Sequence, residues 1–296
     1  MESFQPDLYS GLAVSISPYL ASAGSSSRVL KISGSLKGAA MYLSRVQLSP
    51  SLAVQKQLAR LLSENSYGIH QILWDLFDGD ERFLFREESS REQLLSKRNL
   101  PVYYLLSKAR PAQDNPIFLV ETKIFEPCLN PGDRLAFRLR ANPTVARKTE
   151  GQKRGKRHDV LMDAQYHWLR EQCELHGLPV EGGKGQLKQS LVQEKPEQFD
   201  QGQIETRLQD VSQTAARSWL IHRGTRLGFD IYPPKLHCNG YRWNLLHKKQ
   251  RGAGFSSVDY RGELLVTEPE LFIKNIFAGM GPAKAFGCGL MLIRRI

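Results

Sequence analysis

The residues best suited to binding chemistry lie near the C-terminus, in the segment GMGPAKAFGCGL at positions 279–290. Lys284 lies there among four glycines, Gly279, Gly281, Gly287 and Gly289. Glycine lets backbone N–H groups approach a ligand closely, and lysine adds a positive charge, so such a loop can bind phosphate groups. The lysine lacks the neighbouring glycine and Ser or Thr of a Mg²⁺–nucleotide loop. A glycine-rich loop taken alone is more often a simple turn, so both interpretations stand.

Basic residues form a second candidate binding surface in the middle of the chain. Arg138 and Arg140 alternate on a predicted strand, so both side chains can face one groove. The next stretch holds six cations within eleven residues: Arg147, Lys148, Lys153, Arg154, Lys156 and Arg157. Such a run is often only a solvated loop, but its glycines would also allow a flexible hairpin that follows an RNA backbone. A weaker basic cluster comprises Lys248, Lys249 and Arg251.

The seven histidines and four cysteines show no metal-binding pattern. No histidine pair has the HExxH or a similar ligand spacing, and the cysteines are far apart with no CxxC pair. The sequence therefore predicts neither a structural zinc site nor a disulfide framework, and we expect no metal or other cofactor. A reducing, cytoplasmic setting is the simplest interpretation.

Composition limits the class of protein. With 296 residues and 41% hydrophobic content, the chain can bury a core and is not disordered throughout. The net charge of +11 favours a polyanionic partner, although charge alone does not separate RNA, DNA and an anionic membrane. No apolar run reaches the roughly 18 residues that would span a bilayer.

The elements that must position these residues follow from periodicity. The first part predicts strand 41–48, helix 52–62, a helix from a cap at Asn65 or Ser66 to residue 77, and strands 82–87, 101–108, 116–125 and 134–140. The second part predicts helix 159–176, strands 227–236 and 255–266, helix 269–277 and strand 289–293. Residues 182–203 show no apolar face, which predicts a mobile insertion.

This order predicts an α+β protein with two tandem ferredoxin-like (RRM-like) βαββαβ domains. We place the first domain at residues 41–130 and the second at 131–296. The second helix of the first domain is weakly marked, because residues 109–114 contain Pro111. Residues 1–40 are rich in Ser, Gly and Ala without a sustained period, and lack the pattern of a secretory signal. We interpret them as lying outside the folded core, as a flexible extension, a tag or a translation upstream of a start at Met41, and expect their deletion to leave folding and cleavage intact.

Several segments together resemble the CasE (Cse3) family. They are MYLSR at 41–45, YGIHQILW at 67–74, FLFR at 83–86, FRLRANP at 137–143 and GPAKAFGCGL at 281–290. Members of this family are CRISPR RNA-processing endoribonucleases of type I-E Cascade. The resemblance extends from about Met41 to the C-terminus. It implies two ferredoxin-like domains, metal-independent cleavage of repeat hairpins in precursor crRNA, and retention of the mature crRNA as a subunit beside other Cascade proteins.

The resemblance also implies roles for individual residues. His70 matches the family's catalytic histidine, and Tyr67, three residues earlier, can share its helix face. Histidine suits proton transfer near neutral pH, and the substrate 2′-hydroxyl would attack to give a 2′,3′-cyclic phosphate. The implied RNA-binding residues are Arg138, Arg140, Lys153, Arg154, Lys156, Arg157 and Lys284.

Less specific interpretations compete with these roles. His70 could instead be a partly buried helix histidine, and Tyr67 a core residue or an RNA-stacking aromatic. The whole chain could be a non-catalytic subunit that binds RNA hairpins on the same fold. It could also be a basic nucleic-acid-binding protein whose glycine-rich loop is only a turn.

Overall fold

The computed structural model describes residues 40–49, 68–79, 82–88, 101–147, 155–245 and 254–296. Its first sheet contains β1 (Met41–Leu48), β2 (Leu84–Glu88), β3 (Val102–Ser107) and β4 (Phe118–Phe125). The order across this sheet is β2-β3-β1-β4, and every neighbouring pair is antiparallel. Helix α2 (Gly68–Trp74) comes between β1 and β2 in the chain and packs against the sheet.

Strand β1 follows the predicted alternation. Ser44, Val46 and Leu48 are buried on one face, and Val46 and Leu48 join Leu73 of α2 in a compact core. The predicted strands 82–87, 101–108 and 116–125 correspond to β2, β3 and β4. Residues 108–117 contain no helix, and Pro111 in this segment disfavours one. The predicted helix 52–62, Tyr67 and the proposed cap at Asn65 or Ser66 lie outside the described residues.

The second sheet repeats the same relative strand order. It contains β5 (Arg134–Ala141), β8 (Phe229–Ile231), β9 (His237–Leu245), β10 (Gly254–Val266) and β11 (Met291–Arg295). The order is β11-β5-β10-β8, with β9 also paired to β10, and all pairs are antiparallel. Helix α7 (Pro269–Ala278) agrees with the predicted helix 269–277. The two sheets share one core, in which Met41, Leu106, Leu139 and Ile276 are all buried.

The predicted strand 227–236 is wrong in length. Strand β8 ends at Ile231, and a short 3₁₀ helix, η1, occupies Pro233–Lys235. Two consecutive prolines remove the N–H groups that a longer strand would need for pairing. Strand β9 follows directly and was not predicted.

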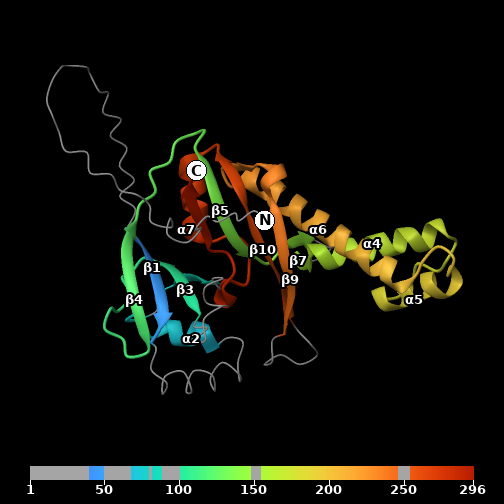
Figure 1. Cartoon of the computed structure of the whole chain (residues 1–296), viewed down its shortest axis with the longest axis horizontal. Coiled ribbons are helices and arrows are strands. Elements are labelled where there is room, and N and C mark those ends of the chain that lie inside the picture. Colours follow the sequence, from blue (N-terminus) through green and yellow to red (C-terminus); the bar gives the residue numbers. More distant parts are fainter. Residues whose placement is uncertain (1–39, 50–67, 80–81, 89–100, 148–154, 246–253) are drawn as a thin grey trace, which may run out of the picture.

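A helical arm of residues 160–226 extends from the second sheet, away from the first, with α5 at its far end (Figure 1). Helix α4 (Val160–Leu175) agrees with the predicted helix 159–176. The Asp159 carboxylate caps it by accepting hydrogen bonds from the Leu161 and Met162 N–H groups at 2.9 and 3.0 Å. We call residues 160–226 the arm, and the other described residues the body.

The prediction of a mobile insertion at residues 182–203 is wrong. Helix α5 (Lys184–Glu194) lies in this segment, and helix α6 (Gln201–Arg226) begins there. Leu187 and Leu191, one helical turn apart, are buried against Leu169 and Cys173 of α4. Two leucines therefore suffice to attach α5, and its glutamines and lysines are good helix formers. Among the described residues, no helix is both long and apolar enough to cross a membrane.

Candidate active site

His70 lies on α2 inside a cluster of aromatic rings. Its imidazole stacks on Phe83 with the ring centroids 5.1 Å apart, meets the Trp74 ring edge-on at 5.2 Å, and lies 5.9 Å from the Phe85 ring. The residue is 6% exposed. Burial lowers the pKa of His70 below its ordinary value of 6.5, because desolvation disfavours the imidazolium. The neutral ring, which can accept a proton, therefore predominates at neutral pH.

Strand β2 connects this cluster to the rest of the body. Its residues alternate, so Phe85 faces α2 while Leu84 belongs to the core shared with the second sheet. Arg86, on the same side of the strand as Leu84, is buried. The same short strand thus positions His70 through its aromatic face and contacts the second sheet through its other face.

The glycine-rich loop packs on β2. A side chain at Gly287 would lie 3.3 Å from the Phe85 ring, and one at Gly279 would clash with Leu84 at 2.7 Å. The Gly289 N–H donates to the Arg140 carbonyl at 2.7 Å, which ties the loop to β5. The loop therefore touches the ring that contacts His70, and it lies beside the predicted RNA-binding strand.

Lys284 lies in the short 3₁₀ helix η2 (Lys284–Phe286) inside this loop. Its ammonium donates a hydrogen bond to the Ala278 carbonyl at the end of α7. Burial lowers the pKa of Lys284. The side chain thus has a structural contact, and the loop is an ordered turn whose role in phosphate binding stays a prediction.

Arg138 and Arg140 both take part in ion pairs: Arg138 pairs across the two sheets, and Arg140 pairs within the second sheet. Arg140 binds Asp259 of β10 through two hydrogen bonds of 2.9 Å, and Arg138 binds Glu88 of β2 at 3.1 Å. Buried Arg86 contacts both carboxylates, Asp259 at 3.3 Å and Glu88. These carboxylates compete with RNA phosphates for the two arginines, so their predicted contact with RNA stays a prediction.

The two described ends of the basic run pair as antiparallel strands, as the hairpin interpretation requires. Strand β6 (Thr144–Arg147) pairs antiparallel with β7 (Lys156–Asp159), and Lys156 and Arg157 are exposed there. Arg147 binds Asp163 of α4 at 2.9 Å, which holds the hairpin against the base of the arm. Lys153, Arg154 and the cluster of Lys248, Lys249 and Arg251 lie outside the described residues.

The sequence analysis missed the network of Arg86, Glu88 and Asp259. One signal was present, because Arg86 shares the apolar face of a short strand with Leu84 and needs a buried partner there. One partner, Glu88, is two residues along the same strand, but Asp259 is 173 residues away in the chain, so no local pattern identifies it. Among the described residues, no group of three or more His, Cys, Asp or Glu side chains is arranged to hold a metal ion.

Comparison with known proteins places the chain in a family. The family described as "CRISPR associated protein" matches residues 41–206 and 187–295. The "CRISPR system Cascade subunit CasE" of Escherichia coli is 27% identical, covering 85% of this chain and 98% of its own length. The "CRISPR-associated endoribonuclease Cse3" of Thermus thermophilus is 26% identical, covering 86% and 99%. The solved structure of Cse3 bound to a 19-nucleotide RNA has a TM-score of 0.54 at 24% identity, covering 86% and 99%.

The chain thus has the mixed α/β fold seen in Cse3, with two antiparallel sheets. The chain belongs to the CRISPR-associated protein family of CasE and Cse3.

Proposed function

We propose that the chain is a metal-independent endoribonuclease that cleaves repeat hairpins in precursor CRISPR RNA. The observation that carries this proposal is its alignment over 98–99% of the length of two relatives, one named an endoribonuclease and the other a Cascade subunit. The product would stay bound as mature crRNA beside other Cascade subunits, in the cytoplasm. Both halves would be ferredoxin-like domains, at residues 41–130 and 131–296, as their common strand order supports.

The proposed chemistry uses the RNA as its own nucleophile. The substrate 2′-oxygen bonds to the adjacent phosphorus while the bond from phosphorus to the 5′-oxygen breaks. The leaving 5′-oxygen takes up a proton from water, so the products are a 2′,3′-cyclic phosphate and a 5′-hydroxyl. Neutral His70, whose pKa is lowered by burial, is in the form that accepts the 2′-hydroxyl proton. Tyr67 would orient this hydroxyl or the imidazole.

Cations of the body would bind the RNA and offset charge on the phosphorane. The exposed Lys156 and Arg157 of the β6–β7 hairpin, with Lys153 and Arg154, would follow the backbone of an A-form stem. Arg138, Arg140 and Lys284 would contact phosphate near the glycine-rich loop.

The burial of His70 favours a second candidate function. A 6% exposed histidine packed among three aromatic rings also fits a structural role, in a subunit that binds hairpins and does not cut them. The two candidates differ in turnover and share the basic surface.

The deciding experiment incubates the purified chain with a cognate repeat hairpin in excess EDTA and identifies the product ends. Cleavage to a 2′,3′-cyclic phosphate is the result we expect. Hairpin-selective binding with no cleavage, in EDTA or in added Mg²⁺, would favour the binding subunit. Equal affinity for unrelated RNAs would contradict both candidates.

A further inference from the structure

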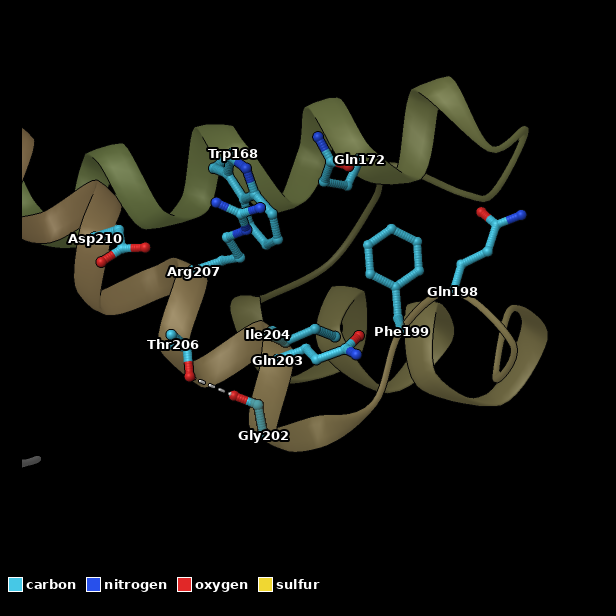
Figure 2. Close-up of a pocket in the computed structure, with 10 residues that line it drawn as sticks. All are labelled: Trp168, Gln172, Gln198, Phe199, Gly202, Gln203, Ile204, Thr206, Arg207 and Asp210. Atoms are coloured by element: carbon cyan, nitrogen blue, oxygen red, sulfur yellow. Dashed lines mark hydrogen bonds between the residues drawn. The ribbon is translucent and has the colours of Figure 1, made fainter.

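The arm contains a pocket of its own, remote from His70. A cavity of about 810 Å³ opens between α4, α6 and the segment that joins α5 to α6 (Figure 2). The lining residues are Trp168 and Gln172 from α4, Gln198 and Phe199 from the joining segment, and Gly202, Gln203, Ile204, Thr206, Arg207 and Asp210 from α6. None of these residues takes part in the proposed RNA cleavage.

The lining combines apolar rings with amide groups. Trp168 and Phe199 are half-buried and pack against the small core of the arm, so each keeps part of its ring accessible. Gln172, Gln198 and Gln203 supply side-chain amides, which both donate and accept hydrogen bonds, as a peptide backbone also does. Such a lining matches an extended peptide that inserts one large apolar side chain.

Two charged side chains on α6 complete the lining. Arg207 and Asp210 are three residues apart, so they are neighbours on the helix surface, and both are exposed. Neither forms an ion pair with another described residue of the chain. Asp210 therefore presents a carboxylate that a cationic ligand can reach.

The charge of the arm differs from that of the rest of the chain. Its outer part, residues 164–216, has eight acidic and five basic side chains, a net charge of −3. The complete arm, residues 160–226, has a net charge of −1, and the remaining 229 residues have a net charge of +12. An acidic environment repels the phosphates of a nucleic acid and attracts a basic partner.

We propose that this pocket docks a basic, extended protein segment with one large apolar side chain. The apolar side chain packs between Trp168 and Phe199, the glutamine amides bind its backbone, and Asp210 pairs with a Lys or Arg. The segment belongs to a neighbouring Cascade subunit, and this assignment of the source rests on the proposed function. The arm thereby holds a protein partner at a distance from the RNA-processing body.

The test uses the full chain and fluorescein-labelled, overlapping 15-residue peptides that cover the other Cascade subunits. Fluorescence anisotropy measures the dissociation constant of each peptide. We expect at least one basic peptide to bind, with an affinity that falls as salt rises. Asp210→Lys should weaken binding roughly tenfold, because it reverses the charge at the pocket. Glu174→Lys makes the same charge change at an exposed position of α4 outside the pocket, and should weaken binding much less.

A second pair of variants tests the apolar contact. Trp168→Ala should weaken the same peptide at least tenfold, and thermal unfolding reports whether the arm still folds. Leu175→Ala is the matched control, because Leu175 is 71% exposed on α4 and does not line the pocket. If Trp168→Ala fails to fold, the comparison of Asp210→Lys with Glu174→Lys still tests the proposal, because both positions are exposed.

Several results would overturn the proposal. One is that no peptide binds, or that Asp210→Lys and Glu174→Lys have equal effects. A dimer that Asp210→Lys dissociates in sedimentation equilibrium would identify a second copy of this chain as the occupant. Single-stranded RNA that binds the wild type and not Trp168→Ala would identify a nucleic-acid site. Hairpin cleavage is measured on the same variants and should not change. If the wild type itself does not cleave the hairpin, the proposed nuclease activity fails, and this result is independent of peptide binding.

Discussion

The body and the arm are built on different principles. In the body, β2 contacts residues from distant parts of the chain on both faces, and all four glycines of the glycine-rich loop have a positive φ, which other residues rarely adopt. In the arm, three successive helices bury a small core of Leu169, Cys173, Leu187, Leu191, Ile204 and Leu208. The packing constraints that position the candidate active site therefore lie in the body, and the arm can vary without disturbing them. This difference predicts that equivalent substitutions have unequal effects in the two regions.

The largest contrast should come from two histidines. His70→Ala in the body is expected to lower the rate of hairpin cleavage about 10²–10⁴-fold, because it removes the proposed proton acceptor. His167→Ala, at a 58% exposed position on α4, should leave the rate unchanged. Single-turnover cleavage and hairpin affinity are measured for both, with thermal unfolding as a check on folding. If the His70→Ala variant folds and cleaves at the wild-type rate, the role of His70 is structural and the catalytic proposal is wrong.

Ion pairs should show the next largest contrast. Asp259→Ala removes the carboxylate that Arg140 and the buried Arg86 share; Arg86 keeps Glu88, and Arg140 loses its carboxylate partner. We expect a loss of about 2–3 kcal/mol in the free energy of unfolding, because two largely buried guanidinium groups lose a compensating charge. Lys188→Ala in the arm breaks a pair with Glu205, which is 55% exposed, and should cost less than about 1 kcal/mol. Urea denaturation of both variants gives the comparison, and equal losses would contradict it.

Replacing a glycine by alanine should change the free energy of unfolding in opposite directions in the body and in the arm. Gly289 has a φ of +95°, and a Cβ there would lie 3.1 Å from the Met280 carbonyl oxygen, so Gly289→Ala should destabilise the body by about 1–3 kcal/mol. Gly185 lies in α5 with nothing within 4 Å of an added Cβ. Gly185→Ala should stabilise the arm by a few tenths to about 1 kcal/mol. Hydrogen exchange of each region measures both changes, and two losses of similar size would refute the contrast.

The parts predicted from sequence are those whose signals are local. Strand 41–48 and helices 159–176 and 269–277 were predicted from apolar spacing within a few neighbouring residues, and they correspond to β1, α4 and α7. Helix α6 was missed because its buried stripe includes Ser212, Ala216 and Gly224, which do not stand out by hydropathy.

The candidate site likewise combines features with a local sequence signal and features that depend on distant residues. His70 and the glycine-rich loop were identified by motif, and packing on β2 brings them together. The carboxylate partners of Arg138 and Arg140 were not foreseeable, because they depend on how distant strands meet. The arm pocket likewise needs α4, α6 and the segment that joins α5 to α6, and of these only α4 was predicted.

The smallest effect concerns pH, and we expect it in the body. Because burial lowers the pKa of His70, the unfolded chain binds a proton in a pH range where the folded body does not. The free energy of unfolding should therefore fall as the pH drops below the ordinary histidine value of 6.5, by at most about 1.4 kcal/mol per pH unit from this group. His70→Phe keeps an aromatic ring against Phe83 and removes the titration, so its stability should depend less on pH over this range. Urea denaturation between pH 5 and pH 8 measures the slopes of the wild type and His70→Phe, and an unchanged slope in His70→Phe would show that His70 is solvated in the folded body.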